Sequence, residues 1–119
     1  CHTRRQRQMC IRDSRKPWDT AKDVDESAVI TPLRQMSEVP SVASGRIHLS
    51  QNGTVKQDAD LSEMVWSVPE IIADLSTMYT LQQGDVIYMG TPAGVGAVSR
   101  GDVLTGGVEG IGDFEVKIA

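Results

Sequence analysis

The stretch at residues 90–96, Gly-Thr-Pro-Ala-Gly-Val-Gly, combines residue types that could bind a small polar ligand. It holds one hydroxyl group, on Thr91, beside the rigid Pro92 and three glycines. Glycine can adopt positive φ angles and lets the backbone approach a ligand closely, because it has no Cβ. The apolar run at residues 86–89 lies directly before this stretch, and such a run is typical of a strand buried on both faces. The sequence therefore predicts a buried strand that presents a polar loop from a rigid base.

Two glycine motifs of known mechanism do not fit residues 90–96. A Walker phosphate-binding loop needs Gly-Lys-Ser/Thr at the start of a helix, but no lysine follows these glycines. A dinucleotide fingerprint needs a third spaced glycine and a helix, and residues 97–101 do not have a helical pattern. Glycine content alone favours a plain connection between two strands over a binding loop.

Other reactive side chains leave alternatives open. Lys22 lies among acidic residues, so it could form a surface ion pair, or it could present a cation to an anionic substrate or a developing oxyanion. His48 lies on the polar face of the predicted strand with Arg46 and Ser50, which favours an exposed histidine over a catalytic one. Cys1 and Cys10 are separated by eight residues, a spacing that fits neither a zinc site nor a disulfide scaffold.

Length and composition indicate one modest domain. The 119 residues include five aromatic side chains, so aliphatic residues must form most of the core. Residues 1–16 carry six basic and one acidic side chain, a net of +5, whereas the other 103 residues carry six basic and fifteen acidic ones, a net of −9. No nucleic-acid-binding motif follows this basic segment, so we expect it to be solvated or covered by a partner. No apolar run approaches the roughly 20 residues of a membrane span, and no signal peptide is recognised, which favours a cytoplasmic protein.

Periodicity predicts an α+β fold that is mainly β. Residues 46–51 alternate polar and apolar, Asn52-Gly53 is a strong signal for a type I′ hairpin turn, and residues 54–57 should return antiparallel. A capping box at Ser67 and Glu70 begins a helix that should end near residue 80 and face the sheet with one apolar stripe. Further on we expect a short strand at 103–104, a turn at 106–107, a glycine-interrupted strand or bulged turn at 108–113, and a last strand at 114–118.

Three separated segments, residues 17–22, 60–73 and 90–96, resemble the fumarylacetoacetate hydrolase family in order and in register. Within that family the chain is most similar to the bacterial fumarylpyruvate hydrolases and related acylpyruvases. The resemblance implies that residues 1–119 are the C-terminal portion of a catalytic domain, a mixed β-sandwich roll with one packed helix. It also implies a homodimer that binds a small keto-acid, with Mg²⁺ or Mn²⁺ at the mouth of the roll and no nucleic-acid or membrane partner.

Members of that family hydrolyse a carbon–carbon bond in a β-diketo acid. The metal chelates the α-keto acid, a His–Glu pair activates water, and the metal and a lysine stabilise the enolate that leaves, since an enolate needs concentrated positive charge in a dry site. The resemblance assigns the lysine role to Lys22 and an oxyanion-stabilising role to Gln8. It makes Arg5 a contact of the substrate carboxylate.

The turn at Gly90, Thr91 and Pro92 corresponds to the family's carboxylate-binding turn, in which the threonine is the polar contact. Two features depart from the family. Cys1 stands where a metal-binding aspartate is expected, and the family's Glu-x-Glu metal pair and His–Glu pair fall upstream of this sequence, so no metal ligand is assigned within it. Besides hydrolysis, the resemblance leaves open a decarboxylase or isomerase of related keto-diacids, or a non-catalytic binding module.

Overall fold

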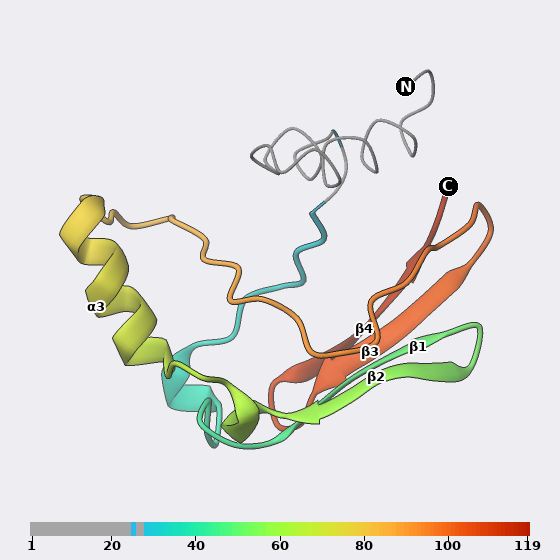
Figure 1. Ribbon diagram of the computed structural model, residues 1–119, viewed down its shortest axis with the longest axis horizontal. Coiled ribbons are helices and arrows are strands. Elements are labelled where there is room, and N and C mark those ends of the chain that lie inside the picture. Colours follow the sequence, from blue (N-terminus) through green and yellow to red (C-terminus); the bar gives the residue numbers. More distant parts are fainter. Residues whose placement is uncertain (1–24, 26–27) are drawn as a thin grey trace. The chain divides into compact units, whose positions relative to one another are not determined.

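The computed structural model describes residue 25 and residues 28–119. The chain divides at Pro32 into two units, and the second is Leu33–Ala119. All the regular elements considered below belong to the second unit (Figure 1). The N-terminal segments of the sequence prediction, including residues 17–22, fall outside the described residues.

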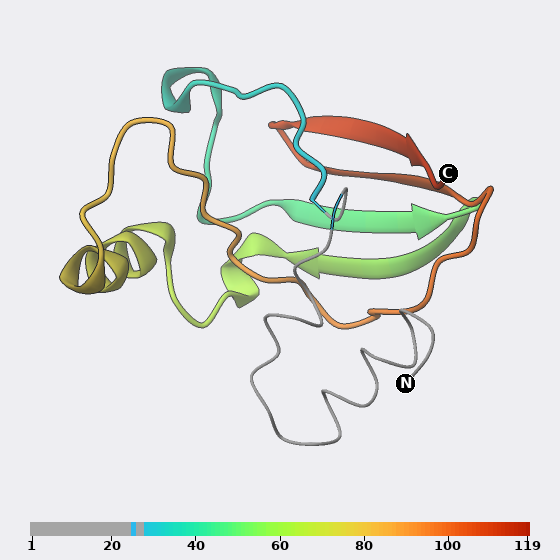
Figure 2. The ribbon, with the colours of Figure 1, turned by 90° about the horizontal axis from the view of Figure 1, so that it is seen from above.

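A four-stranded antiparallel sheet forms the centre of the second unit. Its strands are β1 (Arg46–Gln51), β2 (Thr54–Asp60), β3 (Val103–Val108) and β4 (Gly112–Lys117), in the spatial order β2-β1-β3-β4 (Figure 2). The turn between β1 and β2 has φ 50° at Asn52 and 80° at Gly53, as a type I′ turn requires. The predicted hairpin is therefore confirmed, and so is the mainly β fold, which has one α-helix among the described residues.

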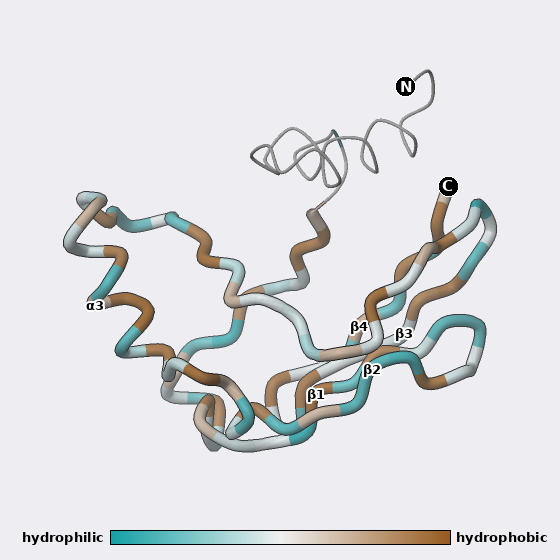
Figure 3. The backbone as a smooth tube through the Cα atoms, viewed as in Figure 1, coloured by the Kyte–Doolittle hydropathy of each residue, from teal (hydrophilic) through white to brown (hydrophobic). Residues whose placement is uncertain are grey.

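Apolar and polar residues alternate along β1 and β4 (Figure 3). The pairing places the apolar residues of β1, β3 and β4 on one face of the sheet. Leu49, Gly106 and Phe114 are paired across three neighbouring strands, and a Cβ at Gly106 would lie 3.1 Å from the Phe114 ring. The ring thus occupies the space that the missing side chain leaves. Gly106 and Gly107 lie within β3, and the turn expected at this pair is wrong, because both glycines are extended and Val103–Val108 pairs on both sides.

The helix α3 (Val68–Met78) begins after Ser67, as the capping box predicts. The Glu70 carboxylate accepts hydrogen bonds from the backbone N–H and the hydroxyl of Ser67, each 2.7 Å long. No residue of α3 is buried, so the expected burial of its apolar stripe is not observed within the described residues. Two short 3₁₀ helices, η1 (Met36–Glu38) and η2 (Leu61–Glu63), complete the regular structure.

The strand predicted at residues 86–89 is wrong. Residues 86–89 have no regular secondary structure, and the side chains of Val86 and Tyr88 are 56% and 62% exposed. An apolar run becomes a strand only when a neighbouring strand supplies hydrogen bonds, and none of the four strands pairs with this segment. The polar loop at 90–96 therefore follows an extended, irregular segment rather than a strand of the sheet.

Among the described residues, no helix has both the length and the apolar character needed to cross a membrane.

Candidate functional site

The loop at residues 90–96 is attached to the outer strand β2 by one buried side chain. The amide nitrogen Nε2 of Gln57 donates hydrogen bonds to Thr91 Oγ1, at 2.8 Å, and to the backbone carbonyl oxygen of Pro92, at 2.7 Å. Gln57 is only 9% exposed, and it is the one polar side chain that is buried in the described part of the chain. Thr91 itself is exposed, so its side chain can meet a ligand while the backbone of the next residue is held.

Two of the three loop glycines are required by the geometry. Gly94 has φ +104°, and a Cβ there would collide with the backbone carbonyl oxygen of Lys56 on β2. Gly90 has φ +101°, but open space surrounds the position of its missing Cβ. Gly96 has neither a positive φ nor a close neighbour. The backbone at Gly94 thus makes a close approach to the chain's own β2, whereas the predicted approach to a ligand stays a prediction.

The chain that follows the loop is held by a polar cluster around Asp102, which joins it to the β1–β2 hairpin turn. The Asp102 carboxylate accepts hydrogen bonds from the side chain of Asn52 at 2.8 Å, the backbone N–H of Ser99 at 2.7 Å and the side chain of Gln51 at 2.6 Å. These three donors lower the pKa of Asp102, because they stabilise the charged carboxylate. The Asn52 side-chain oxygen in turn accepts from the backbone N–H of Val103 at 2.9 Å.

Because Gln57 holds Thr91 and Pro92, the loop offers the Thr91 hydroxyl at a defined position. A hydroxyl group can donate one hydrogen bond and accept two, so Thr91 can contact a carboxylate, a carbonyl or an amide. Pro92 has no backbone N–H, so the loop has no main-chain donor at that point. The arrangement is suited to orient a small polar ligand.

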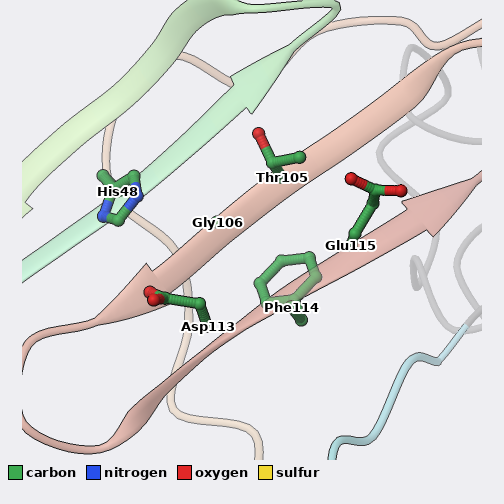
Figure 4. A pocket seen from close by; sticks show the side chains of 6 residues that line it. All are labelled: His48, Thr105, Gly106, Asp113, Phe114 and Glu115. Carbon is green, nitrogen blue, oxygen red and sulfur yellow. The ribbon is translucent and has the colours of Figure 1, made fainter.

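Apart from the loop, an open depression of about 440 Å³ lies on the sheet itself (Figure 4). His48 from β1 contributes to it, with residues of the two strands beyond, namely Thr105, Gly106, Asp113, Phe114 and Glu115. His48 is half-buried, rather than exposed as its sequence context suggests. The carboxylates of Asp113 and Glu115 give this depression an acidic lining, but nothing in it matches a predicted site residue.

The structure locates only part of the predicted site. Gly90, Thr91 and Pro92 lie together in the loop held by Gln57. Lys22, Gln8 and Arg5 lie outside the described residues, as does Cys1, and their predicted roles stay predictions. Within residue 25 and residues 28–119, no three His, Cys, Asp or Glu side chains are placed to hold a metal ion. The described residues therefore do not fit a metal centre.

Gln57 was missed by the sequence interpretation. It follows Lys56 and precedes Asp58 in a stretch of polar residues at the end of a predicted hairpin, where a buried amide has no distinctive signal. Its partners Thr91 and Pro92 are 34 and 35 residues away in the sequence. The sequence offered only an indirect signal for Gln57. A binding loop that presents a hydroxyl group must be held by some other part of the chain, but the sequence does not show which residue holds it.

Comparisons with known proteins relate this geometry to a family. Residues 2–119 match the family model described as fumarylacetoacetate (FAA) hydrolase C-terminal. The chain is 48% identical over 116 residues to a fumarylpyruvate hydrolase of Ralstonia sp, covering 98% of this chain and 60% of that protein. It is 34% identical over 102 residues to the mitochondrial oxaloacetate tautomerase of Rattus norvegicus, covering 86% of this chain and 46% of that protein.

Among solved structures, one similar protein is the fumarylpyruvate hydrolase from Pseudomonas aeruginosa in complex with Mn²⁺ and pyruvate. The match has a TM-score of 0.89 at 38% identity, covering 98% of this chain and 50% of that one. The chain thus spans about half to three-fifths of the length of these relatives.

Proposed function

Because the chain belongs to the fumarylacetoacetate hydrolase family, we propose that the whole protein hydrolyses a carbon–carbon bond of an acylpyruvate such as fumarylpyruvate. The observation that carries the proposal is the exposed Thr91 on a loop held from β2, in a chain 48% identical to a fumarylpyruvate hydrolase. Pyruvate, which the Pseudomonas relative binds, carries a carboxylate that an outward-facing hydroxyl can orient.

The proposed roles of this chain's residues follow from the negative charges of the substrate, on its carboxylate and on the oxygen of the developing enolate. Thr91, within the Gly90–Pro92 turn, donates a hydrogen bond to the substrate carboxylate and fixes its position. Arg5 adds a cation at the same carboxylate, since a guanidinium matches its two oxygens. Lys22 and Gln8 stabilise the negative charge that develops on the substrate oxygen when the bond breaks and an enolate leaves.

A divalent ion, Mn²⁺ or Mg²⁺, is part of the proposal because the Pseudomonas relative binds Mn²⁺. Such an ion would supply Lewis-acid stabilisation of the enolate. Since the described residues provide no group of three ligands, its ligands must come from outside them. The homodimeric state and the cytoplasmic location are likewise proposals that rest on the family resemblance.

The test is turnover of fumarylpyruvate by the full-length protein that carries this sequence, with Mn²⁺ present. We expect loss of the enol absorbance, with fumarate and pyruvate as products. Lys22→Met should lower kcat/KM by about 10²–10³-fold, the usual cost of one electrostatic stabiliser. Lys117→Met, on β4, is the matched control and should leave kcat/KM unchanged. Absence of turnover by the unmodified protein contradicts the proposal, and equal activity of Lys22→Met removes the role given to Lys22.

A second function is favoured by the similarity to the rat oxaloacetate tautomerase. Proton transfer or decarboxylation of a keto-diacid needs the same stabilised enolate but breaks a different bond. Identification of the products by NMR separates the two, because hydrolysis of fumarylpyruvate releases two acids whereas tautomerisation of oxaloacetate releases none. The 119 residues alone, the remaining alternative, are expected to bind Mg²⁺ weakly and to show no turnover.

A further inference from the structure

We propose that Gln57 is a positioning residue that turns the Thr91 hydroxyl proton toward the ligand, so that this point of the site selects a hydrogen-bond acceptor such as a carboxylate. The inference rests on the proposed function for the identity of the ligand, and it adds a residue that the family resemblance did not supply. It follows from the hydrogen bonds of one side chain.

The orientation of the Gln57 amide is determined by its two partners. Nε2 lies 2.7 Å from the carbonyl oxygen of Pro92 and 2.8 Å from Thr91 Oγ1. A backbone carbonyl oxygen can only accept a hydrogen bond, so the side-chain atom facing it must be the NH₂ group. An amide NH₂ has two protons, and these two contacts use both.

The direction of the Thr91 hydroxyl follows. Its oxygen accepts one proton from Gln57, and its own proton cannot point back at the same NH₂ group, because two donors repel each other. The proton must therefore point to another side of the oxygen. Since Thr91 is exposed whereas Gln57 is buried, that side is open to a ligand. The loop then presents a donor, and a carboxylate oxygen is a suitable partner.

A β-bulge explains why Gln57 faces the loop. Leu49 pairs with Gln57 and the next residue, Ser50, pairs with Val55, so Lys56 is the extra residue on β2. Bulges bend a strand and redirect its side chains, often next to functional sites. Here the carbonyl oxygen of Lys56 meets the backbone at Gly94, while the next side chain, Gln57, reaches Thr91 and Pro92. The bulge therefore supplies two neighbouring contacts to the same loop.

The first experiment measures binding of pyruvate to the full-length protein with Mn²⁺, by titration calorimetry. Gln57→Met has a similar length but no donor, so Kd should rise at least about tenfold. In the Thr91→Val background, which lacks the hydroxyl, the same change should raise Kd less than about threefold. Thr91→Ser keeps the hydroxyl and should restore the sensitivity to Gln57→Met. An equal loss of affinity from Gln57→Met with and without the Thr91 hydroxyl would overturn the proposal.

The second measurement is selectivity, which a purely structural role of Gln57 does not predict. Gln57→Glu accepts the hydroxyl proton of Thr91, so the oxygen would present a lone pair to the ligand. The preference for pyruvate over pyruvamide should fall at least about tenfold in Gln57→Glu. In Gln57→Met, where the hydroxyl can rotate, the preference should fall less. An unchanged preference in Gln57→Glu contradicts the assigned direction of the hydroxyl.

The third measurement needs no ligand and separates this inference from the proposed function. Cleavage by proteinase K within residues 90–96 should be at least about tenfold faster in Gln57→Met than in the unmodified protein, while amide exchange in β1 and β3 stays unchanged. If the unmodified protein binds no pyruvate, the proposed function fails and the cleavage rate alone decides the role of Gln57. An unchanged cleavage rate within residues 90–96 would then refute that role.

Discussion

At the scale of single residues, alanine substitutions at the three loop glycines distinguish the cost of backbone strain from the cost of a steric collision. Gly94→Ala puts a Cβ against the Lys56 carbonyl oxygen at φ +104°, so we expect a loss of about 2–3 kcal/mol and release of the loop from β2. Gly90→Ala meets open space at φ +101° and should cost about 1–2 kcal/mol, from strain alone. Thermal unfolding measures the loss of stability, and the rate of cleavage by proteinase K within residues 90–96 reports the release of the loop.

Gly96→Ala is the matched control, because its φ is not positive and nothing lies near its missing Cβ. Its stability should stay within about 0.5 kcal/mol of the unmodified protein. If Gly94→Ala were no worse than Gly90→Ala, the contact between the loop and β2 would not contribute to stability.

The same loop shows which site residues can be predicted from the sequence and which cannot. Thr91 was predicted as the polar contact because residue type and motif are local properties. The partner Gln57 was not predictable, because a hydrogen bond across 34 residues depends on how the chain folds back. The bulge at Lys56 that redirects Gln57 also leaves no mark in the alternation of polar and apolar residues.

At the scale of elements, the Asp102 cluster joins the hairpin turn to the start of β3. The lowered pKa of Asp102 means that its charged form stabilises the folded state. This contribution is fully present above the ordinary pKa of 3.8 and is lost as the pH falls through the lower pKa of the folded state. Asp102→Asn should therefore lower Tm at about pH 7 and reduce the fall in Tm between about pH 6 and pH 3.

Glu115→Gln is the control for Asp102→Asn, since Glu115 is an exposed residue of β4 that does not belong to the Asp102 cluster. The fall in Tm should be reduced rather than abolished in Asp102→Asn. Hydrogen bonds from Arg46, Ser62 and Ser67 lower the pKa of three other carboxylates, those of Asp58, Asp60 and Glu70. An unchanged dependence of Tm on pH in Asp102→Asn would show that the cluster does not couple to folding.

Local signals predicted the elements that depend on local chemistry. Asn52-Gly53 determines a turn by its φ angles, and Ser67 with Glu70 determines a helix start by its hydrogen bonds. The strand expected at 86–89 depended on a partner strand that the described residues do not supply. The turn expected at Gly106-Gly107 failed for a related reason, because in β3 these glycines make room for Phe114 and Asp113 from β4.

At the scale of the whole molecule, the sheet has an apolar face but no large side chain that is fully buried among the described residues. Large apolar side chains are exposed along α3 and around the loop, for example Ile72, Met78, Val86, Tyr88 and Val95. Exposed apolar surface on this scale binds hydrophobic probes and gives folding little hydrophobic driving force. The chain also spans only about half to three-fifths of the length of its relatives.

We therefore predict that the 119-residue chain by itself binds anilinonaphthalene sulfonate and unfolds over a broad temperature range. A well-packed unit of about 87 residues, the size of Leu33–Ala119, would absorb about 60 kcal/mol at its Tm. We expect the unfolding enthalpy of the isolated chain, measured by calorimetry, to be clearly smaller, because few of its side chains are removed from water on folding. The full-length protein is the reference and should unfold sharply without binding the dye. A sharp transition of about 60 kcal/mol in the isolated chain would mean that its own residues form a complete core.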